Sequence, residues 1–146
     1  MSNITQICTF YLGELYLGID VLEVQEVIRA QEMTEIPLTA ETIGGLINLR
    51  GQIVTAVEMR CWLGLPPREG PPMNVVIHVE DATWSLLVDE IGDVIEVDSA
   101  TFEPCPETLD PVLQEMLVGV HKLPERLLLL LNIKEFHRMG MKQSAA

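Results

Sequence analysis

The sequence predicts a mainly β protein whose short antiparallel strands close, or nearly close, into barrels. Apolar and polar residues alternate along most of the chain and give about nine or ten candidate strands. Turn residues separate these strands at hairpin distances, and apolar residues follow helical spacing in only two or three short stretches. A chain of 146 residues fits one domain. Closure is expected because open sheets leave exposed edges.

The first predicted elements are a hairpin and a short helix. Residues 6–12 alternate apolar and polar side chains, and residues 15–19 form the returning strand. Asp20 is a favourable helix N-cap, and the valines that follow it have helical spacing. The pattern therefore predicts a helix over residues 21–28.

The most informative stretch is a second hairpin, over residues 44–60. Two apolar runs flank Arg50-Gly51, and Gly51 is free to take a positive φ at the corner. The hairpin thus displays one guanidinium on a rigid support. It offers no nucleophile, base or metal ligand, which favours binding over catalysis.

The second half of the chain contains more strands and two helices. Residues 66–72 hold four prolines and read as a stiff, exposed connector. Asp110-Pro111 predicts the start of a helix, with Asp110 as the N-cap and Pro111 as the first helical residue. The remaining predictions are strands at 74–79, 83–88, 93–97, 118–123 and 127–131, helices at 111–117 and 132–139, and a frayed tail.

Composition narrows the classes of partner. The formal net charge of −13 disfavours nucleic-acid and anionic membrane surfaces, which attract clustered Lys and Arg. Three distant cysteines without CxxC spacing disfavour a disulfide framework or a zinc site. The N-terminus does not resemble a signal peptide, and no apolar run approaches the roughly 20 residues that span a bilayer. We therefore expect a cytoplasmic protein.

One carboxylate cluster allows an alternative function. Asp89, Glu90 and Asp93 could serve general acid–base chemistry, which needs two carboxyl groups in different environments. A solvated turn between strands explains the same cluster. The enzyme reading, a small β-barrel hydrolase or ligand-binding protein, predicts a deep polar pocket with perturbed carboxylates.

The two tryptophans have different interpretations. Trp62, next to Leu63, is expected in the core. Trp84 lies between polar residues, so it either packs in the core or stands half-exposed in a binding groove.

The hairpin motif resembles the central motif of CheW-like domains. The matching residues are Gly45-Leu46-Ile47-Asn48-Leu49-Arg50-Gly51, followed by Glu58-Met59-Arg60. Weaker similarities with the family lie around residues 16–27, 87–94 and 126–133, so the resemblance covers roughly residues 5–138. Thr55, Glu58 and Met59 stand where the family usually has Pro, Asp and Leu.

The resemblance implies two intertwined SH3-like five-stranded barrels that share a core. Residues 5–138 would form this single domain, and residues 139–146 a flexible C-terminal tail. Members of the family are non-catalytic adaptors without metal or cofactor. They couple the cytoplasmic tips of methyl-accepting chemotaxis receptors to the regulatory domain of the histidine kinase CheA, at the inner face of the membrane. An adaptor paralogue of a non-flagellar chemosensory system fits the same pattern.

The receptor would bind in a groove between the barrels. The expected contacts are Val24 and Ile28 on the first helix, Asn48, Arg50 and Gly51 at the polar edge, and Trp84. Gly45, Ile53, Glu58 and Arg60 would support the motif structurally. An alternative role for Arg50 is an internal salt bridge that fixes the two barrels to each other.

Overall fold

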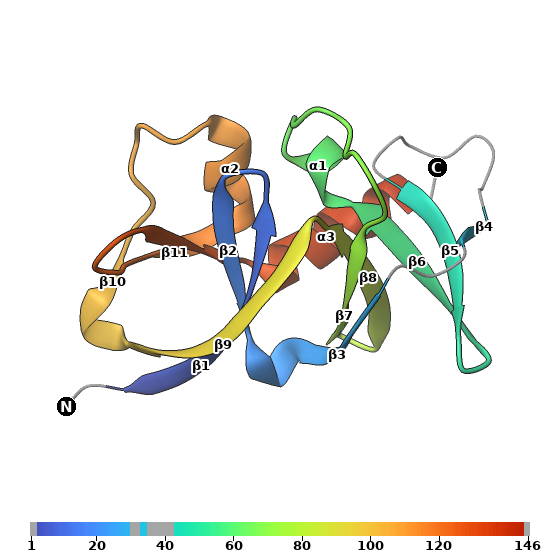
Figure 1. Ribbon diagram of the computed structural model, residues 1–146, viewed down its shortest axis with the longest axis horizontal. Coiled ribbons are helices and arrows are strands. Elements are labelled where there is room, and N and C mark those ends of the chain that lie inside the picture. Colours follow the sequence, from blue (N-terminus) through green and yellow to red (C-terminus); the bar gives the residue numbers. More distant parts are fainter. Residues whose placement is uncertain (1–2, 30–32, 35–42, 145–146) are drawn as a thin grey trace.

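The strands form two six-stranded sheets that belong to one intertwined fold (Figure 1). The computed structural model describes residues 3–29, 33–34 and 43–144. Sheet A has the order β10-β11-β12-β2-β1-β9, and sheet B the order β3-β7-β8-β6-β5-β4. Sheet A consists of β1 (Ile4–Leu12), β2 (Leu15–Asp20), β9 (Glu90–Asp98), β10 (Phe102–Glu103), β11 (Leu117–Lys122) and β12 (Leu127–Leu131). Sheet B consists of β3 (Val24–Ile28), β4 (Met33–Thr34), β5 (Ile43–Leu49), β6 (Gln52–Glu58), β7 (Met73–Val79) and β8 (Ala82–Val88).

The helices are short and few, as the sequence predicts. They are α1 (Met59–Trp62), α2 (Pro111–Met116) and α3 (Ile133–Ser144), with single 3₁₀ turns at η1 (Val21–Glu23) and η2 (Ser99–Thr101). Asp110 caps α2 through its side chain, which accepts a hydrogen bond from the Val112 amide.

The chain leaves sheet A and returns to it, and this path intertwines the two halves. Sheet B is one continuous stretch from β3 to β8, whereas sheet A combines strands from both ends of the chain. The crossings lie at η1 and at Asp89, between β8 and β9. Parallel pairs close each side of the arrangement, β12 with β2 and β6 with β8. The expected mainly β, two-subdomain fold is confirmed. Each sheet has six strands instead of the expected five, because the two-residue strands β4 and β10 each add one.

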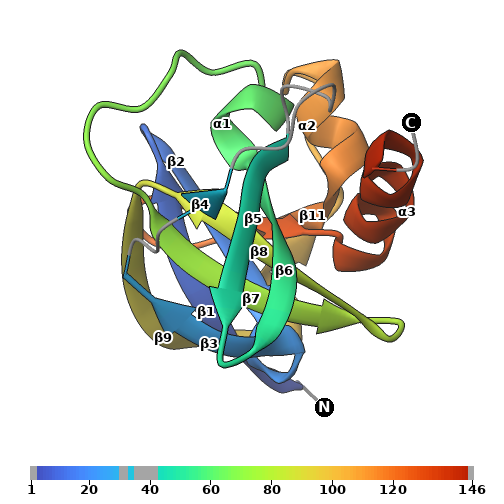
Figure 2. The same cartoon turned by 90° about the vertical axis from the view of Figure 1, so that its right-hand side faces the viewer.

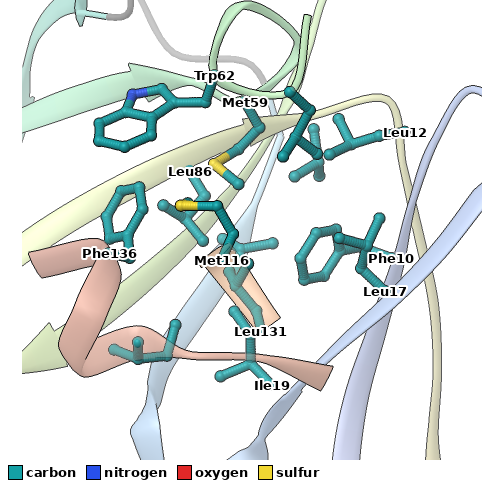
Figure 3. Packing of buried hydrophobic residues seen from close by; sticks show 14 of the residues in the cluster. Phe10, Leu12, Leu17, Ile19, Met59, Trp62, Leu86, Met116, Leu131 and Phe136 are labelled. Carbon is teal, nitrogen blue, oxygen red and sulfur yellow. The ribbon is translucent and has the colours of Figure 1, made fainter. Parts of the chain in front are cut away.

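One large hydrophobic cluster lies between the sheets, and a smaller one belongs to each sheet. Figure 3 shows side chains of both sheets and of α2 and α3 in the shared cluster, among them Phe10, Leu86, Met116 and Phe136. The cluster confined to sheet B includes Ile47 and Val54, and the one confined to sheet A includes Ile7 and Leu128. Alternation along each strand sends one row of side chains to the shared core and the other row to the sheet's own core.

The helix predicted over residues 21–28 is wrong. Asp20 does cap a turn, but the turn is the single 3₁₀ turn η1, and β3 follows it. A bulge between Val24 and Glu26 inserts one residue into β3, so Val24 and Val27 lie opposite Ile77 and Val75 on the same face. The bulge thus gives a strand the three-residue apolar spacing that we interpreted as helical. β-branched valines favour the strand.

The C-terminal region also differs from the prediction. We expected a helix over 132–139 followed by a flexible tail, but α3 continues to Ser144. Gly92 does not break the chain, because β9 runs through it from Glu90 to Asp98.

Candidate functional site

The Arg50 corner has the backbone of a tight hairpin turn. Arg50 and Gly51 have φ values of 53° and 87°, so both central residues of the two-residue turn are left-handed. Turns of this kind match the natural twist of paired strands. The Asn48 side chain stabilises the corner, because its Oδ1 accepts a hydrogen bond of 2.9 Å from the Gly51 amide. The expected hairpin and its corner residues are therefore where the sequence placed them.

Arg50 is exposed and held by one carboxylate. Its side chain is 73% exposed, and Nη1 donates to Glu26 Oε2 at 2.6 Å. This pair joins the hairpin corner to β3, and Figure 2 shows the tip of the β5–β6 hairpin in front of β3. Both residues belong to sheet B, so the alternative role of Arg50 as a bridge between the two barrels is wrong. The second Glu26 oxygen, Oε1, is buried and has no hydrogen-bond partner among the described residues.

The exposed apolar side chains near the corner are Ile53 and Val27, whereas we predicted Val24 and Ile28 as receptor contacts. Ile53 is 61% exposed, so it does not support the hairpin by burial as we expected, whereas its neighbour Val54 is buried. Val24 and Ile28 are half-buried and pack against the hydrophobic clusters, and they lie on β3 rather than on a helix. Val27, on the same strand, is more open to solvent.

Trp84 is a core residue and not part of a surface groove. It is 3% exposed within the shared cluster, and its indole N–H donates to His137 Nδ1 at 3.0 Å. The ring also meets Phe136 edge-on. The polar neighbours Thr83 and Ser85 misled the prediction, because Ser85 is itself buried and donates a hydrogen bond to the Asn74 side chain.

Gly45 occupies a position that a side chain would not fit. Its φ is 148°, and a Cβ atom there would lie 2.7 Å from the Thr34 carbonyl oxygen of β4. The glycine of the motif therefore allows β4 to approach β5 closely.

A second charged group lies away from the corner and contains three residues that the sequence analysis named. Asp89 accepts hydrogen bonds from Arg60 Nε at 2.8 Å and Arg60 Nη2 at 2.5 Å. Arg68, from the proline-rich connector, donates from Nε to the same carboxylate at 2.8 Å. Its Nη1 and Nη2 each donate to one Glu58 oxygen at 2.9 Å. We call Glu58, Arg60, Arg68 and Asp89 the crossover cluster.

The environment of Asp89 does not suit acid–base catalysis. The hydrogen bonds from Arg60, followed by those of the Gly13 amide and Arg68, hold the pKa of Asp89 far below its usual range. A general acid needs the opposite shift. A cavity of about 370 Å³ beside the cluster is lined by Arg60, Pro67, Arg68, Glu69, Pro71, Asp89 and Glu90, and Asp93 is not among these residues. The three carboxylates of the alternative enzyme site therefore do not form one site.

Sequence reasoning missed Glu26 and Arg68. Arg68 lies in a segment that composition assigns to an exposed connector, yet its side chain is only 7% exposed. The sequence gives one indication of this burial. Arg68 is an arginine among four prolines, and it closely follows the motif that contains Glu58. Glu26 lay within the predicted helix, where its strand partner could not be identified.

The described residues contain neither a candidate membrane-spanning helix nor a candidate metal site. None of the helices in the described ranges has the length and apolar character required to cross a bilayer. Histidine, cysteine and carboxylate side chains of the described residues do not gather into a group of three that could hold a metal ion.

Comparison with known proteins agrees with the fold and the motif. The family model of the CheW-like domain matches residues 6–139. The chain is 32% identical over 129 residues to a chemotaxis protein CheW of Klebsiella aerogenes, with 86% of this chain and 77% of the relative covered. It is 30% identical over 130 residues to the chemotaxis protein CheW of Bacillus subtilis, with 88% and 81% covered.

A solved structure is also similar along almost its full length. The crystal structure of the scaffolding protein TtCheW from Thermoanaerobacter tengcongensis superposes with a TM-score of 0.81 at 28% identity and covers 89% of this chain and 90% of that one. Together with the corner motif and the two intertwined sheets, these matches show that the chain belongs to the CheW-like domain family.

Proposed function

We propose that this chain is a non-catalytic chemotaxis adaptor that couples chemoreceptors to the histidine kinase CheA. Residues 5–138 form the adaptor domain, which reaches the inner face of the membrane through its receptors. Relatives named chemotaxis protein CheW and a structural neighbour described as a scaffolding protein support this function. The observation that carries it is the exposed Arg50 guanidinium on a rigid corner.

The receptor binds at the Arg50 corner. Arg50 supplies an exposed charge whose position is set by Glu26, and Ile53 on β6 and Val27 on β3 supply exposed apolar surface. A cation beside apolar side chains suits the tip of a helical hairpin that bears a carboxylate. Asn48 and Gly51 keep the corner in shape through their hydrogen bond.

The regulatory domain of the kinase binds a different face, because one hairpin corner cannot hold two partners at once. The adaptor then fixes receptor and kinase in one geometry, and a shift of the receptor biases the kinase between its conformations. No chemical step is required of the adaptor itself.

Binding measured by calorimetry with a receptor tip fragment and with the kinase regulatory domain tests this proposal. We expect the wild type to bind both. Arg50→Glu places two carboxylates together with Glu26 and removes the exposed cation, so receptor binding weakens at least about tenfold, or about 1.4 kcal/mol. Ile53→Asp weakens it similarly without disturbing the core.

Arg138→Glu is the matched control. Arg138 is also an exposed arginine paired with a glutamate, Glu135, but it lies on α3. Its reversal leaves receptor affinity unchanged. A wild-type protein that binds neither partner contradicts the function, and a normal affinity of both corner variants contradicts the placement of the receptor.

A further inference from the structure

Asp89 occupies the point where the chain returns from sheet B to sheet A. It is the one residue between β8 and β9, and its backbone amide donates to the Tyr11 carbonyl of β1 at 3.0 Å. Its side chain is 17% exposed. The residue is therefore fixed at a junction of the two sheets and not on a free loop.

The Asp89 carboxylate bonds to both sheets at once. Toward sheet A, Oδ2 accepts from the Gly13 amide in the β1–β2 turn at 2.6 Å. Toward sheet B, the same carboxylate accepts from Arg60 on α1, which follows β6, and from Arg68 in the connector. Figure 1 shows the β1–β2 turn and the connector after α1 at the same end of the molecule.

The two arginines extend this junction through sheet B. Arg60 Nη1 donates to the Pro66 carbonyl at 2.8 Å, which fastens the start of the connector. Arg68 donates to both Glu58 oxygens and to the Leu87 carbonyl at 3.0 Å, which ties the connector to the ends of β6 and β8. Every guanidinium nitrogen of Arg60 and Arg68 thus donates at least one hydrogen bond within the protein.

The crossover cluster adds directional bonds to those that hold the two sheets together. The hydrophobic attraction between the sheets is non-directional, and only the close packing of side chains in the shared core constrains their angle. Charge-assisted bonds from a planar guanidinium require a defined geometry, most of all when they are paired as between Arg60 and Asp89. The cluster therefore adds a geometric constraint on the angle between the two sheets.

We propose that Asp89 is a positioning residue that sets the relative orientation of sheets A and B. This inference deepens the proposed function, since an adaptor that holds two partners transmits a signal only if its two faces keep a fixed angle. The receptor corner lies on sheet B alone, so Asp89 affects coupling between partners and not the receptor contact.

Residual dipolar couplings of backbone amides test the orientation without any partner. In the wild type, couplings from both sheets fit one alignment tensor. In Asp89→Asn, each sheet still fits its own coordinates, but one tensor no longer fits both. A common tensor with the wild-type orientation would overturn the proposal. Arg60→Lys, which keeps the charge but loses the paired bonds, gives the same test should Asp89→Asn fail to fold.

Glu103→Gln is the matched control. It also removes an ion-paired carboxylate, but the Glu103–Lys122 pair lies within sheet A, on β10 and β11. A common tensor is expected for this variant. A loss of the common tensor in Glu103→Gln as well would contradict a specific role of the crossover cluster.

The functional arm uses a receptor tip fragment and the kinase. For Asp89→Asn, binding to each partner alone stays within about twofold of the wild type, while receptor-dependent control of kinase activity falls about fivefold or more. Wild-type control in the variant overturns the positioning role. A wild type that binds neither partner contradicts the proposed function. The residual dipolar couplings then still test whether Asp89 sets the orientation of the two sheets.

Discussion

Arg50 and Arg60 belong to the same motif but have opposite environments. Arg50 extends into solvent with one carboxylate partner among the described residues, whereas all three guanidinium nitrogens of Arg60 donate to Asp89 or to the Pro66 carbonyl. The hairpin corner fixes Arg50 by local backbone geometry, which a sequence reveals. Arg60 is fixed by Asp89, whose proximity depends on the path of the chain between two sheets.

At the residue scale, Gly45→Ala should destabilise the protein by about 1–3 kcal/mol. The methyl group meets the Thr34 carbonyl at 2.7 Å, and φ is unfavourable for alanine. Urea unfolding followed by tryptophan fluorescence measures the loss. Gly64→Ala is the control, since Gly64 also has a positive φ of 71° but nothing lies within 4 Å. An equal loss in both variants would show that backbone strain alone matters at Gly45.

The depressed pKa of Asp89 predicts a pH dependence of stability. Because the folded-state pKa lies below the unfolded one, the charged carboxylate contributes stability at neutral pH. That contribution begins to fall as the pH drops below about 4, the ordinary carboxyl range. The difference in unfolding free energy between wild type and Asp89→Asn should therefore be constant from pH 8 to about pH 5 and shrink at lower pH. A difference that stays constant down to pH 2 would show that the carboxylate charge plays no part.

At the scale of elements, β3 shows where periodicity fails. Alternation correctly predicted strands such as β1 and β8, and Asp110-Pro111 correctly predicted the start of α2. The bulge in β3 changes the spacing of apolar residues, and nothing local in Val24–Ile28 reveals the pairing with β7 that produces it. The prediction of Trp84 as a groove residue was wrong for a similar reason. Trp84 is buried by α3, which lies about 50 residues later in the chain.

Backbone chemical shifts and amide exchange test the strand β3. We expect strand-like carbon shifts over Val24–Ile28 and slow exchange of amides paired with β7. Helical shifts over this segment would contradict the structure and restore the interpretation from periodicity.

The hydrogen bond from Trp84 to His137 should help to hold α3 on the core. Trp84→Phe keeps most of the ring packing but removes the bond, so we expect a loss of about 1 kcal/mol and faster amide exchange in α3. Trp62→Phe is the control, because the Trp62 indole nitrogen is buried without a partner among the described residues. Equal losses in both variants would assign the effect to ring area alone.

At the scale of the whole molecule, the shared core makes the two sheets interdependent. Phe10 and Leu17 of sheet A pack in the same cluster as Leu86 and Val57 of sheet B. The mainly β class, the short helices and the central hairpin could all be predicted from local patterns. The crossover cluster could not, because its charged side chains come from a hairpin, a connector and a junction that only the folded chain brings together.

Sheet B should not fold alone, although it is one continuous stretch. A fragment of residues 24–88 exposes the side chains that face the shared cluster, and we expect no cooperative unfolding by circular dichroism. In the full chain, Leu17→Ala and Leu86→Ala should each cost about 2–5 kcal/mol and lower a single common transition. Separate transitions for the two sheets, or a folded fragment, would contradict interdependence.

The return of the chain to sheet A has a consequence for biosynthesis. β2 lies between β1 and β12, so one side of this strand has no partner until more than 100 further residues have left the ribosome. All strands of sheet B are synthesised during that interval, while the first hairpin keeps an unpaired edge. Closing so distant a pair is slow and leaves the growing chain open to misassembly. Nascent chains stopped before Leu127 should therefore be the species most dependent on molecular chaperones.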